Sequence, residues 1–323
     1  MSDSEDWSFP EELQPSQAEL RFDLDSVLDS MVALRAEVPD DAFTASILGT
    51  ERGGNGVVIQ DGLVLTIGYL ITEAQTIWLT TNRGVVVPGY PVGYDQATGF
   101  GLVRALAPLG APALARGSAS SCAPEDRVYV VAHGGRRHAL KARLVDKREF
   151  AGYWEYLLDE ALFTAPAHPE WSGAALVNED GLLVGIGSLL VQEAVDGRTV
   201  QGNMLVPIDL LEPILESMLA TGASGLPPRP WLGLYAGESE EQVIVGGIAD
   251  SGPAAKAGIR QGDLVLEVAG TRVNSLAAFL RAVWRCGPAG TRIPLKVARE
   301  GDVLRFELAS VDRSDLLKRP RLH

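Results

Sequence analysis

Short apolar runs recur along the middle of the chain, from about Ala42 to Gln201, and Gly, Asp-Gly, Asn and Pro separate them. Typical runs are Gly56–Gln60, Leu63–Thr66, Thr76–Thr80, Gly84–Val87, Arg127–Ala132 and Leu157–Phe163. Runs of strand length with turn residues between them are typical of β-sandwiches or paired β-barrels, and not of alternating strand–helix units. We therefore predict a mostly β domain over residues 40–220, which ends in a helix that starts near Glu212.

Before this domain, the apolar residues recur with a helical spacing. Leu24, Val27, Leu28 and Met31 lie at positions i, i+3, i+4 and i+7, which is the spacing of one apolar helix face. We predict an amphipathic helix over residues 23–38. Two roles are open for its apolar face, because it can dock on the β domain of its own chain or form an assembly surface.

Acidic residues outnumber basic ones and gather near the start of the chain. The formal net charge is −14 at pH 7, which argues against binding to nucleic acid or to an anionic membrane surface. Residues 1–22 are acidic and contain prolines, so we predict a disordered N-terminus. No apolar run has the length that a bilayer span requires, and we expect no membrane partner.

Two features bear on the cellular compartment. The first residues contain neither the basic region nor the apolar region of a secretory signal. The only cysteines, Cys122 and Cys286, lie far apart in the sequence, and two isolated thiols are typical of a reducing compartment. We therefore predict a cytoplasmic protein.

The composition changes after the β domain. Residues 221–230 are rich in Gly and Pro, which is typical of a linker. A second domain is predicted over residues 231–312, and residues 313–323 form a short basic tail.

A serine stands in a turn of small residues that is followed by an apolar run, the hairpin turn Asn178–Gly181 and a second apolar run. This order predicts strand, tight turn and strand, with Ser172 just before the first strand. The pattern resembles the nucleophile segment of the HtrA/DegP-type trypsin-fold serine proteases. The resemblance implies a trypsin-like double β-barrel, with Ser172 at the position of the nucleophile.

The other two positions of that family's catalytic triad hold different residues. Gly54–Ile59 and Asp61–Thr66 resemble the approach to the family's histidine, and Tyr69 stands at the histidine position. Asp95–Thr98 resembles the approach to the family's aspartate, and Gly99 stands in its place. A phenol with a pKa near 10 is a poor base at neutral pH, and glycine supplies no carboxylate.

The residues before the serine also depart from the family pattern. Glu170 stands where the family has a glycine whose N–H binds the oxyanion, and Trp171 is large enough to fill the cleft. We therefore predict a catalytically inactive pseudoprotease, which is not an enzyme. The alternative is an active serine endopeptidase that uses Ser172 with a non-standard base, and His168 is the candidate closest in sequence.

Residues 231–312 resemble a PDZ domain, a β-sandwich with two helices, through Trp231–Leu234 and the segment Ile248–Ile259. PDZ domains bind an extended peptide as an added strand, and backbone amides receive its terminal carboxylate. The resemblance places peptide-binding positions in the loop and on the helix beside the groove: Leu232, Gly233, Leu234, Phe279, Leu280 and Val283. The alternative role of the three helix residues is to fill the domain core.

These features predict a cytoplasmic scaffold or accessory subunit that binds protein or peptide C-termini. It is expected to form a homo-oligomer, a trimer by the resemblance, or to join a hetero-complex. A third reading is a structural subunit of a larger cytoplasmic enzyme, docked by the N-terminal helix. His133 and His138 are predicted as exposed loop residues, and the scattered histidines lack metal-ligand spacing, so neither a metal nor a cofactor is expected.

Overall fold

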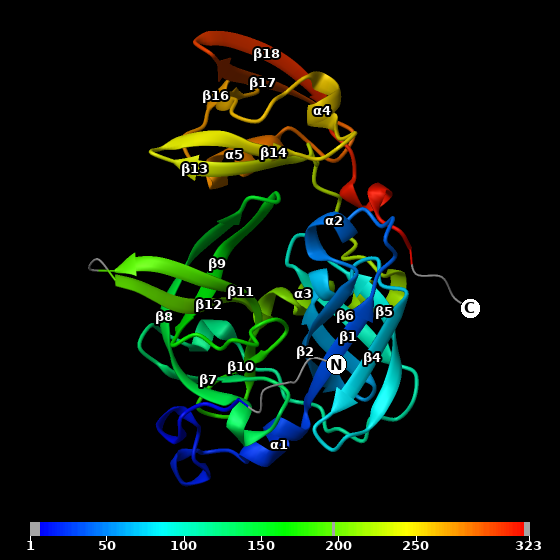
Figure 1. Cartoon of the computed structure of the whole chain (residues 1–323), viewed down its shortest axis with the longest axis vertical. Coiled ribbons are helices and arrows are strands. Elements are labelled where there is room, and N and C mark those ends of the chain that lie inside the picture. Colours follow the sequence, from blue (N-terminus) through cyan, green and yellow to red (C-terminus); the bar gives the residue numbers. More distant parts are fainter. Residues whose placement is uncertain (1–6, 196–197, 320–323) are drawn as a thin grey trace. The chain divides into compact units, whose positions relative to one another are not determined.

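The computed structural model describes residues 7–195 and 198–319. The chain divides into two compact units, and each is described by itself (Figure 1). The first unit comprises Met1–Arg148, Glu160–Gly225 and Lys318–His323, and the second comprises Glu149–Asp159 and Leu226–Leu317. The second unit therefore includes a short segment that is distant in sequence from the rest of it.

The first unit contains two closed antiparallel barrels. The first barrel has the strand order β1-β2-β3-β6-β5-β4 and consists of β1 (Met31–Glu37), β2 (Glu51–Gln60), β3 (Leu63–Ile67), β4 (Thr76–Thr81), β5 (Val86–Tyr94) and β6 (Phe100–Ala105). The second has the order β10-β11-β12-β9-β8-β7 and consists of β7 (Arg127–Val131), β8 (Ala139–Gly152), β9 (Tyr156–Ala165), β10 (Ala175–Val177), β11 (Leu183–Val195) and β12 (Arg198–Pro207). Closure leaves no free sheet edge in either barrel. The predicted double β-barrel is confirmed.

Short helices connect and flank these strands. They are α1 (Leu24–Asp29), α2 (Ala45–Leu48) and α3 (Glu212–Thr221), with single 3₁₀ turns at η1 (Glu11–Leu13), η2 (Gln17–Glu19), η3 (Gly68–Leu70), η4 (Ala119–Ser121), η5 (Arg136–His138) and η6 (Ile208–Leu210). Helix α3 begins at Glu212 with Pro213 in its first turn and ends at Thr221, and Gly222 caps it with a left-handed backbone. Both ends follow the helix signals in the sequence.

The predicted helix over residues 23–38 is wrong beyond its first turns. Helix α1 ends at Asp29, and Met31–Glu37 is a strand that pairs with both β2 and β4. From Val32 onward, buried and exposed positions follow the alternation of a strand, as Leu34 is buried and Arg35 is exposed. Pairing on both edges also satisfies the backbone groups that close the barrel. The barrel therefore begins before residue 40.

The apolar residues of α1, Leu24, Val27 and Leu28, are buried in the first unit. Of the two roles left open for this helix, docking on its own chain is the observed one.

The described part of the N-terminus is ordered, although residues 1–22 were predicted to be disordered. Phe9 and Leu13 pack against the core of the second barrel, and the Phe9 N–H donates to Arg137 O at 3.1 Å. These apolar contacts offset the entropy of ordering an acidic segment. Residues 1–6 of the predicted region lie outside the described residues.

The second unit is a single antiparallel sheet with two helices. Its strands have the order β13-β14-β15-β17-β18, with β16 paired to β15, and its elements are β13 (Leu234–Ser239), β14 (Gln242–Ile248), α4 (Pro253–Ala257), β15 (Leu264–Val268), β16 (Thr271–Arg272), α5 (Leu276–Arg285), β17 (Arg292–Arg299), β18 (Asp302–Ala309) and η7 (Arg313–Leu316). The amphipathic face of α5 fills its core, together with Leu157 from the distant segment.

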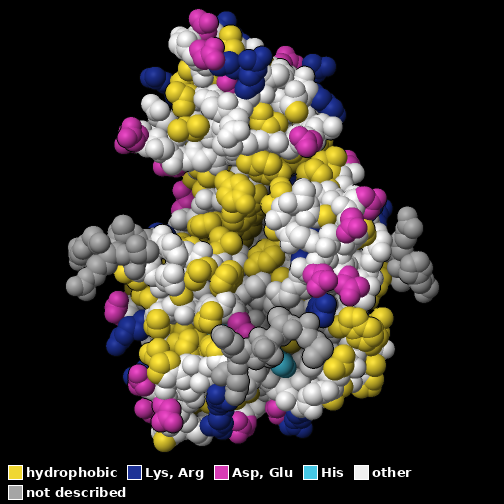
Figure 2. Space-filling model, viewed as in Figure 1, with side chains coloured by type: hydrophobic (Ala, Val, Ile, Leu, Met, Phe, Trp, Pro, Cys, Tyr) yellow, Lys and Arg dark blue, Asp and Glu magenta, His cyan; other side chains and the backbone are white. Residues whose placement is uncertain are grey.

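Figure 2 shows how charge is distributed on one face of the described residues. On the face shown in Figure 2, acidic and basic side chains of the described residues are interspersed and form no continuous basic surface. Within residues 7–195 and 198–319, no helix combines the length and apolarity needed to cross a membrane.

Candidate active site

Ser172 lies just before β10 in the second barrel, and strand β2 of the first barrel holds its loop. The Asn55 N–H donates to Ser172 O at 2.7 Å, and Asn55 Nδ2 donates to Glu170 O at 2.9 Å. Gly173 has φ +74°, and a Cβ at this position would lie 1.9 Å from Asn55 O. Only glycine permits this close approach of the two barrels. Gly173 is therefore required by the backbone geometry, whatever chemistry Ser172 performs.

Tyr69, in the turn η3, contacts the serine directly. Its phenol oxygen lies 2.8 Å from Ser172 Oγ and 2.8 Å from Ser188 O. A phenol has one hydrogen, and a carbonyl oxygen can only accept. The Tyr69 hydroxyl therefore has two acceptors for its one hydrogen, Ser172 Oγ and Ser188 O. Burial raises the pKa of Tyr69 to about 12, so the phenol is neutral at pH 7.

Gly99 ends the turn before β6, and its carbonyl oxygen accepts the Gly68 N–H at 2.6 Å. Position 99 therefore lies beside η3, which carries Tyr69, as the family resemblance implies for the triad aspartate. The nearby Asp95 carboxylate accepts the Thr98 N–H at 2.8 Å and so caps its own turn.

The ring of His168 is buried and both of its nitrogens are engaged. Nδ1 accepts the Glu170 N–H at 3.0 Å, and Nε2 donates to His138 O at 2.8 Å. Burial lowers the His168 pKa to about 4, and the aromatic rings of Trp7 and Phe9 pack against it. This imidazole is neutral and is not available as a base for Ser172 in this arrangement.

The hydrogen bond from the Glu170 N–H to His168 also changes the oxyanion region. The Glu170 N–H stands where the family resemblance places an oxyanion donor, but it is donated to His168 Nδ1. A bound substrate gains this donor only if the peptide unit turns away from His168. The Glu170 carboxylate lies 3.4 Å from His138 Nδ1 at the surface.

A cavity of about 410 Å³ opens beside the serine, lined by residues from both barrels that include Gly54, Asn55, His133, His138, Trp171 and Ser172. His133 and His138 are half-buried here, and not exposed loop residues as predicted. The sequence offered a signal for His133, because it directly follows the buried run of β7. Its Nε2 is buried and has no hydrogen-bond partner, and burial lowers the His133 pKa.

A buried polar network fixes the turn that carries Tyr69. The guanidinium of Arg52 donates to Tyr69 O at 2.8 Å, to Thr72 O at 2.9 Å and to Thr44 Oγ1 at 2.7 Å. Glu73 accepts the Thr44 N–H at 2.7 Å and the Lys318 N–H at 2.9 Å. These bonds satisfy backbone groups that would otherwise be buried without a partner.

We expect Glu73→Ala to lower the free energy of unfolding by about 3 kcal/mol, because several buried donors lose their acceptor and Arg52 loses its counter-charge. The melting temperature of the first unit should fall by roughly 6–12 °C, measured by circular dichroism. Glu51→Ala is the matched control, because Glu51 makes an exposed ion pair with Arg35 whose loss should cost at most about 1 kcal/mol. Equal effects of the two substitutions would contradict the role given to Glu73.

The second unit contains the other predicted site. The N–H groups of Leu232, Gly233 and Leu234 converge on one point, the carboxylate of Glu155, at 2.8–3.2 Å. The predicted helix residues do not reach this point: Phe279, Leu280 and Val283 are buried in the domain core, which is the alternative role stated for them. Leu276 lines a cavity beside β13, together with Ala277, which the sequence reasoning missed.

Family models match both units. Residues 54–186 match the trypsin-like peptidase domain, and residues 230–309 match the PDZ domain. A probable periplasmic serine endoprotease DegP-like of Halomonas elongata is 24% identical over 263 residues, which cover 77% of this chain and 54% of the relative. Serine endoprotease DegS of Haemophilus influenzae is 23% identical over 266 residues, with coverages of 78% and 75%.

Solved structures show the same fold. The HtrA-type protease AlgW with decapeptide has a TM-score of 0.54 and 17% sequence identity, and the match covers 93% of this chain and 100% of that one. The chain spans about half the length of the DegP-like relatives it matches. Fold and site together define a trypsin-like peptidase domain joined to one PDZ domain. In its fold and in the order of its two domains, the chain is similar to these HtrA-like proteins.

The prediction that the chain is not an enzyme is contradicted, because the relatives are named serine endoproteases. It equated the loss of the imidazole–carboxylate pair with the loss of activity. The serine hydroxyl instead has a phenol as its partner.

The prediction of a cytoplasmic protein is also contradicted, because the DegP-like relatives are named periplasmic. The two cysteines are free thiols, and free thiols do not by themselves determine a compartment.

Proposed function

We propose that this chain is a periplasmic, HtrA-like serine endopeptidase in which Ser172 is the nucleophile and Tyr69 takes the place of the histidine. The observation that carries the proposal is the 2.8 Å contact between Tyr69 Oη and Ser172 Oγ. The relatives named serine endoproteases support the reaction class. The Ser188 carbonyl supports the role of Tyr69, because it is a second acceptor that keeps the phenol oxygen beside the serine.

In this reaction the Tyr69 phenolate takes the hydroxyl proton of Ser172, and Oγ attacks the carbonyl carbon of the scissile peptide bond. The C–N bond then breaks, and the Tyr69 phenol returns the proton to the leaving amine. Water hydrolyses the resulting acyl ester by the same proton transfers in the second half.

The phenolate is scarce at neutral pH. With a Tyr69 pKa of about 12, its fraction at pH 7 is on the order of 10⁻⁵. Turning the Glu170 N–H from His168 toward the oxyanion adds a further cost, since one oxyanion donor contributes roughly a hundredfold to a thousandfold in turnover. The proposed enzyme is therefore slow at neutral pH.

Two substitutions test the proposal. Ser172→Ala and Tyr69→Phe should each lower the cleavage of a fluorogenic casein at pH 9 by at least about a hundredfold. Tyr69→Phe keeps the aromatic ring, so a loss reports on the hydroxyl group. Tyr90→Phe, which changes a half-buried tyrosine of β5, is the matched control and should leave the rate unchanged. Cleavage that survives Ser172→Ala would refute the proposal, and survival in Tyr69→Phe would remove Tyr69 from it.

The PDZ domain is a peptide-binding module. We propose that it takes peptide C-termini with a free carboxylate, because three N–H groups of its loop converge on a single carboxylate position. A homo-oligomer, a trimer by resemblance to the family, remains a proposal that sedimentation analysis can test. Docking to a larger enzyme through α1 has lost its basis, because the apolar residues of α1 are buried in its own unit.

A further inference from the structure

The tip of the β8–β9 hairpin, residues Glu149–Asp159, belongs to the second unit. Strand β13 pairs with β14 along one edge, and at its other side the Ala236 N–H donates to Tyr153 O at 3.2 Å. A main-chain bond of this kind is what an added peptide strand makes with a PDZ domain. The hairpin tip thus occupies part of the edge on which a peptide would lie.

The carboxylate of Glu155 follows at the end of this edge. Its Oε1 accepts the N–H groups of Leu232, Gly233 and Leu234 at 3.1, 2.8 and 3.1 Å. Glu155 is 8% exposed and has φ +61°, a left-handed backbone that is unfavourable for a residue with a side chain. Glu155 ends the turn of the hairpin, and this left-handed backbone aims its carboxylate at the three N–H groups.

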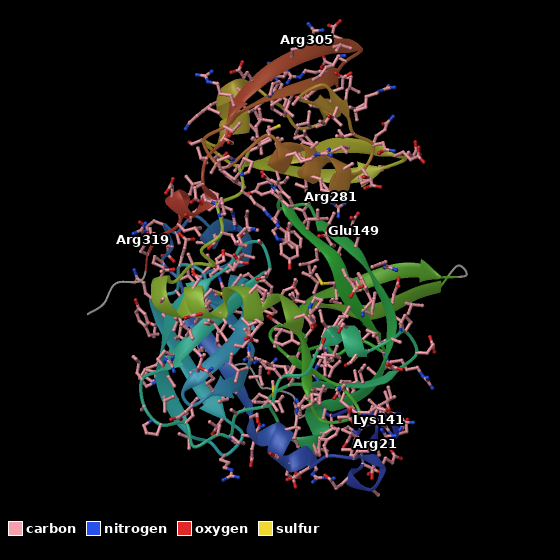
Figure 3. The ribbon with its side chains drawn as sticks, turned by 180° about the vertical axis from the view of Figure 1, so that it is seen from behind. Arg21, Lys141, Glu149, Arg281, Arg305 and Arg319 are labelled. Atoms are coloured by element: carbon pink, nitrogen blue, oxygen red, sulfur yellow. The ribbon has the colours of Figure 1, made fainter. Side chains whose placement is uncertain are left out.

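Further contacts hold the tip to the same unit. Arg281 of α5 forms ion pairs with Glu149 and Asp159, one at each end of the tip (Figure 3). Leu157 lies in the domain core. Between the tip, β13 and the start of α5 a cavity of about 510 Å³ remains, lined in part by Tyr153, Trp154, Ala236, Gly237, Leu276 and Ala277.

We propose that Glu155 is an internal ligand of the PDZ domain, whose side chain occupies the place of a peptide's terminal carboxylate, so that a C-terminal peptide must displace the hairpin tip in order to bind. The proposal rests on the peptide-binding half of the proposed function and is independent of the endopeptidase half. The two ligands exclude one another, because three N–H donors serve one carboxylate and a second buried carboxylate would lack a partner.

The strength of the contact between Glu155 and the three N–H groups depends on the protonation state of its carboxyl group. Burial raises the pKa of Glu155 to about 7, against the opposing effects of the Leu234, Leu232 and Gly233 N–H groups and of Arg313. The other titratable groups around it are Tyr235 and Tyr153, with Asp250 acting on Tyr235. A docked pKa above the free value of 4.5 means that docking is strongest below pH 4.5 and weakens as pH rises to about 7.

The test uses the full chain and two readouts. The first is hydrogen exchange at the amides of Leu232–Leu234 without peptide. Protection in the wild type should fall on the order of fiftyfold between pH 5 and pH 8. In Glu155→Gln, which keeps the shape of the protonated side chain, protection should not change with pH beyond the intrinsic exchange rate. In Glu155→Ala it should be lost.

The second readout is binding of dye-labelled hexapeptides that end in Val, Leu, Ile or Phe, measured by fluorescence anisotropy at pH 7. Glu155→Ala should bind at least about tenfold more tightly than the wild type, and the C-terminal amides of the same peptides should bind to neither. Glu155→Gly is a second variant that also relieves the left-handed backbone. Glu240→Ala, in the exposed β13–β14 turn, is the matched control and should behave as the wild type.

Each of the following results would refute one named part of the proposal. Unchanged exchange in Glu155→Ala would refute the internal ligand. Equal peptide affinity in the wild type and Glu155→Ala would refute the competition alone. If exchange is faster in Glu155→Ala but neither the wild type nor any variant binds a peptide, the domain does not bind these peptides. The proposed competition between Glu155 and a peptide would then be refuted as well. None of these results depends on cleavage by Ser172.

Discussion

Cleavage by Ser172 should accelerate about tenfold for each pH unit between pH 7 and pH 10, which is about a thousandfold in all. The rate follows the Tyr69 phenolate, and its fraction rises in proportion to hydroxide as long as the pH stays below the Tyr69 pKa of about 12. The measurement is kcat/KM on a fluorogenic peptide, with circular dichroism at each pH to show that the fold is retained.

An imidazole base would give a different profile. Burial lowers the pKa of both His133 and His168, so either ring would already be neutral at pH 7 and the rate would not rise further. A flat profile from pH 7 to pH 10 would therefore exclude Tyr69 as the proton acceptor. Tyr69→Phe supplies the control, because its residual rate should lack the tenfold slope.

Rebuilding the family's triad should produce the second large effect. The combined substitutions Tyr69→His and Gly99→Asp should raise kcat at pH 7 by about 10⁴. Loss of the base in a serine protease costs on the order of 10⁶, and the engaged Glu170 N–H withholds roughly a hundredfold of the recovery. Position 99 accepts the carboxylate at some cost, since Gly99 has φ +83°.

The single substitutions separate the contributions. Tyr69→His alone should recover far less, because an unsupported imidazole loses about four orders of magnitude when its carboxylate partner is absent. The triple variant that adds Ser172→Ala should return to the background rate, measured with the same fluorogenic peptide. A double variant no faster than the wild type would mean that the defect does not lie at positions 69 and 99.

Local patterns predicted the parts of this fold that depend on neighbours in sequence. The short apolar runs predicted a mostly β domain, and the family resemblance around Ser172, Tyr69 and Gly99 implied the double barrel that is observed. The helix predicted to include Met31 failed because the same apolar positions fit two periods, and pairing on both edges of β1 decided between them.

The contacts of Glu155 could not be predicted from the residues around it in the sequence. Its partner N–H groups lie 77 to 79 positions further along the chain, and nothing in the flanking residues distinguishes it from an ordinary surface glutamate. Likewise, His168 packs against Trp7 and Phe9, which come from a segment that the composition assigned to disorder.

The PDZ domain of this chain is not a contiguous stretch of sequence, because Glu149–Asp159 is part of it. A domain exchange with a single junction at residue 225 would transfer an incomplete second unit, because Leu157 and Glu155 would stay with the barrel domain. A domain exchange that keeps the second unit whole therefore has to carry Glu149–Asp159 along with the residues after 225.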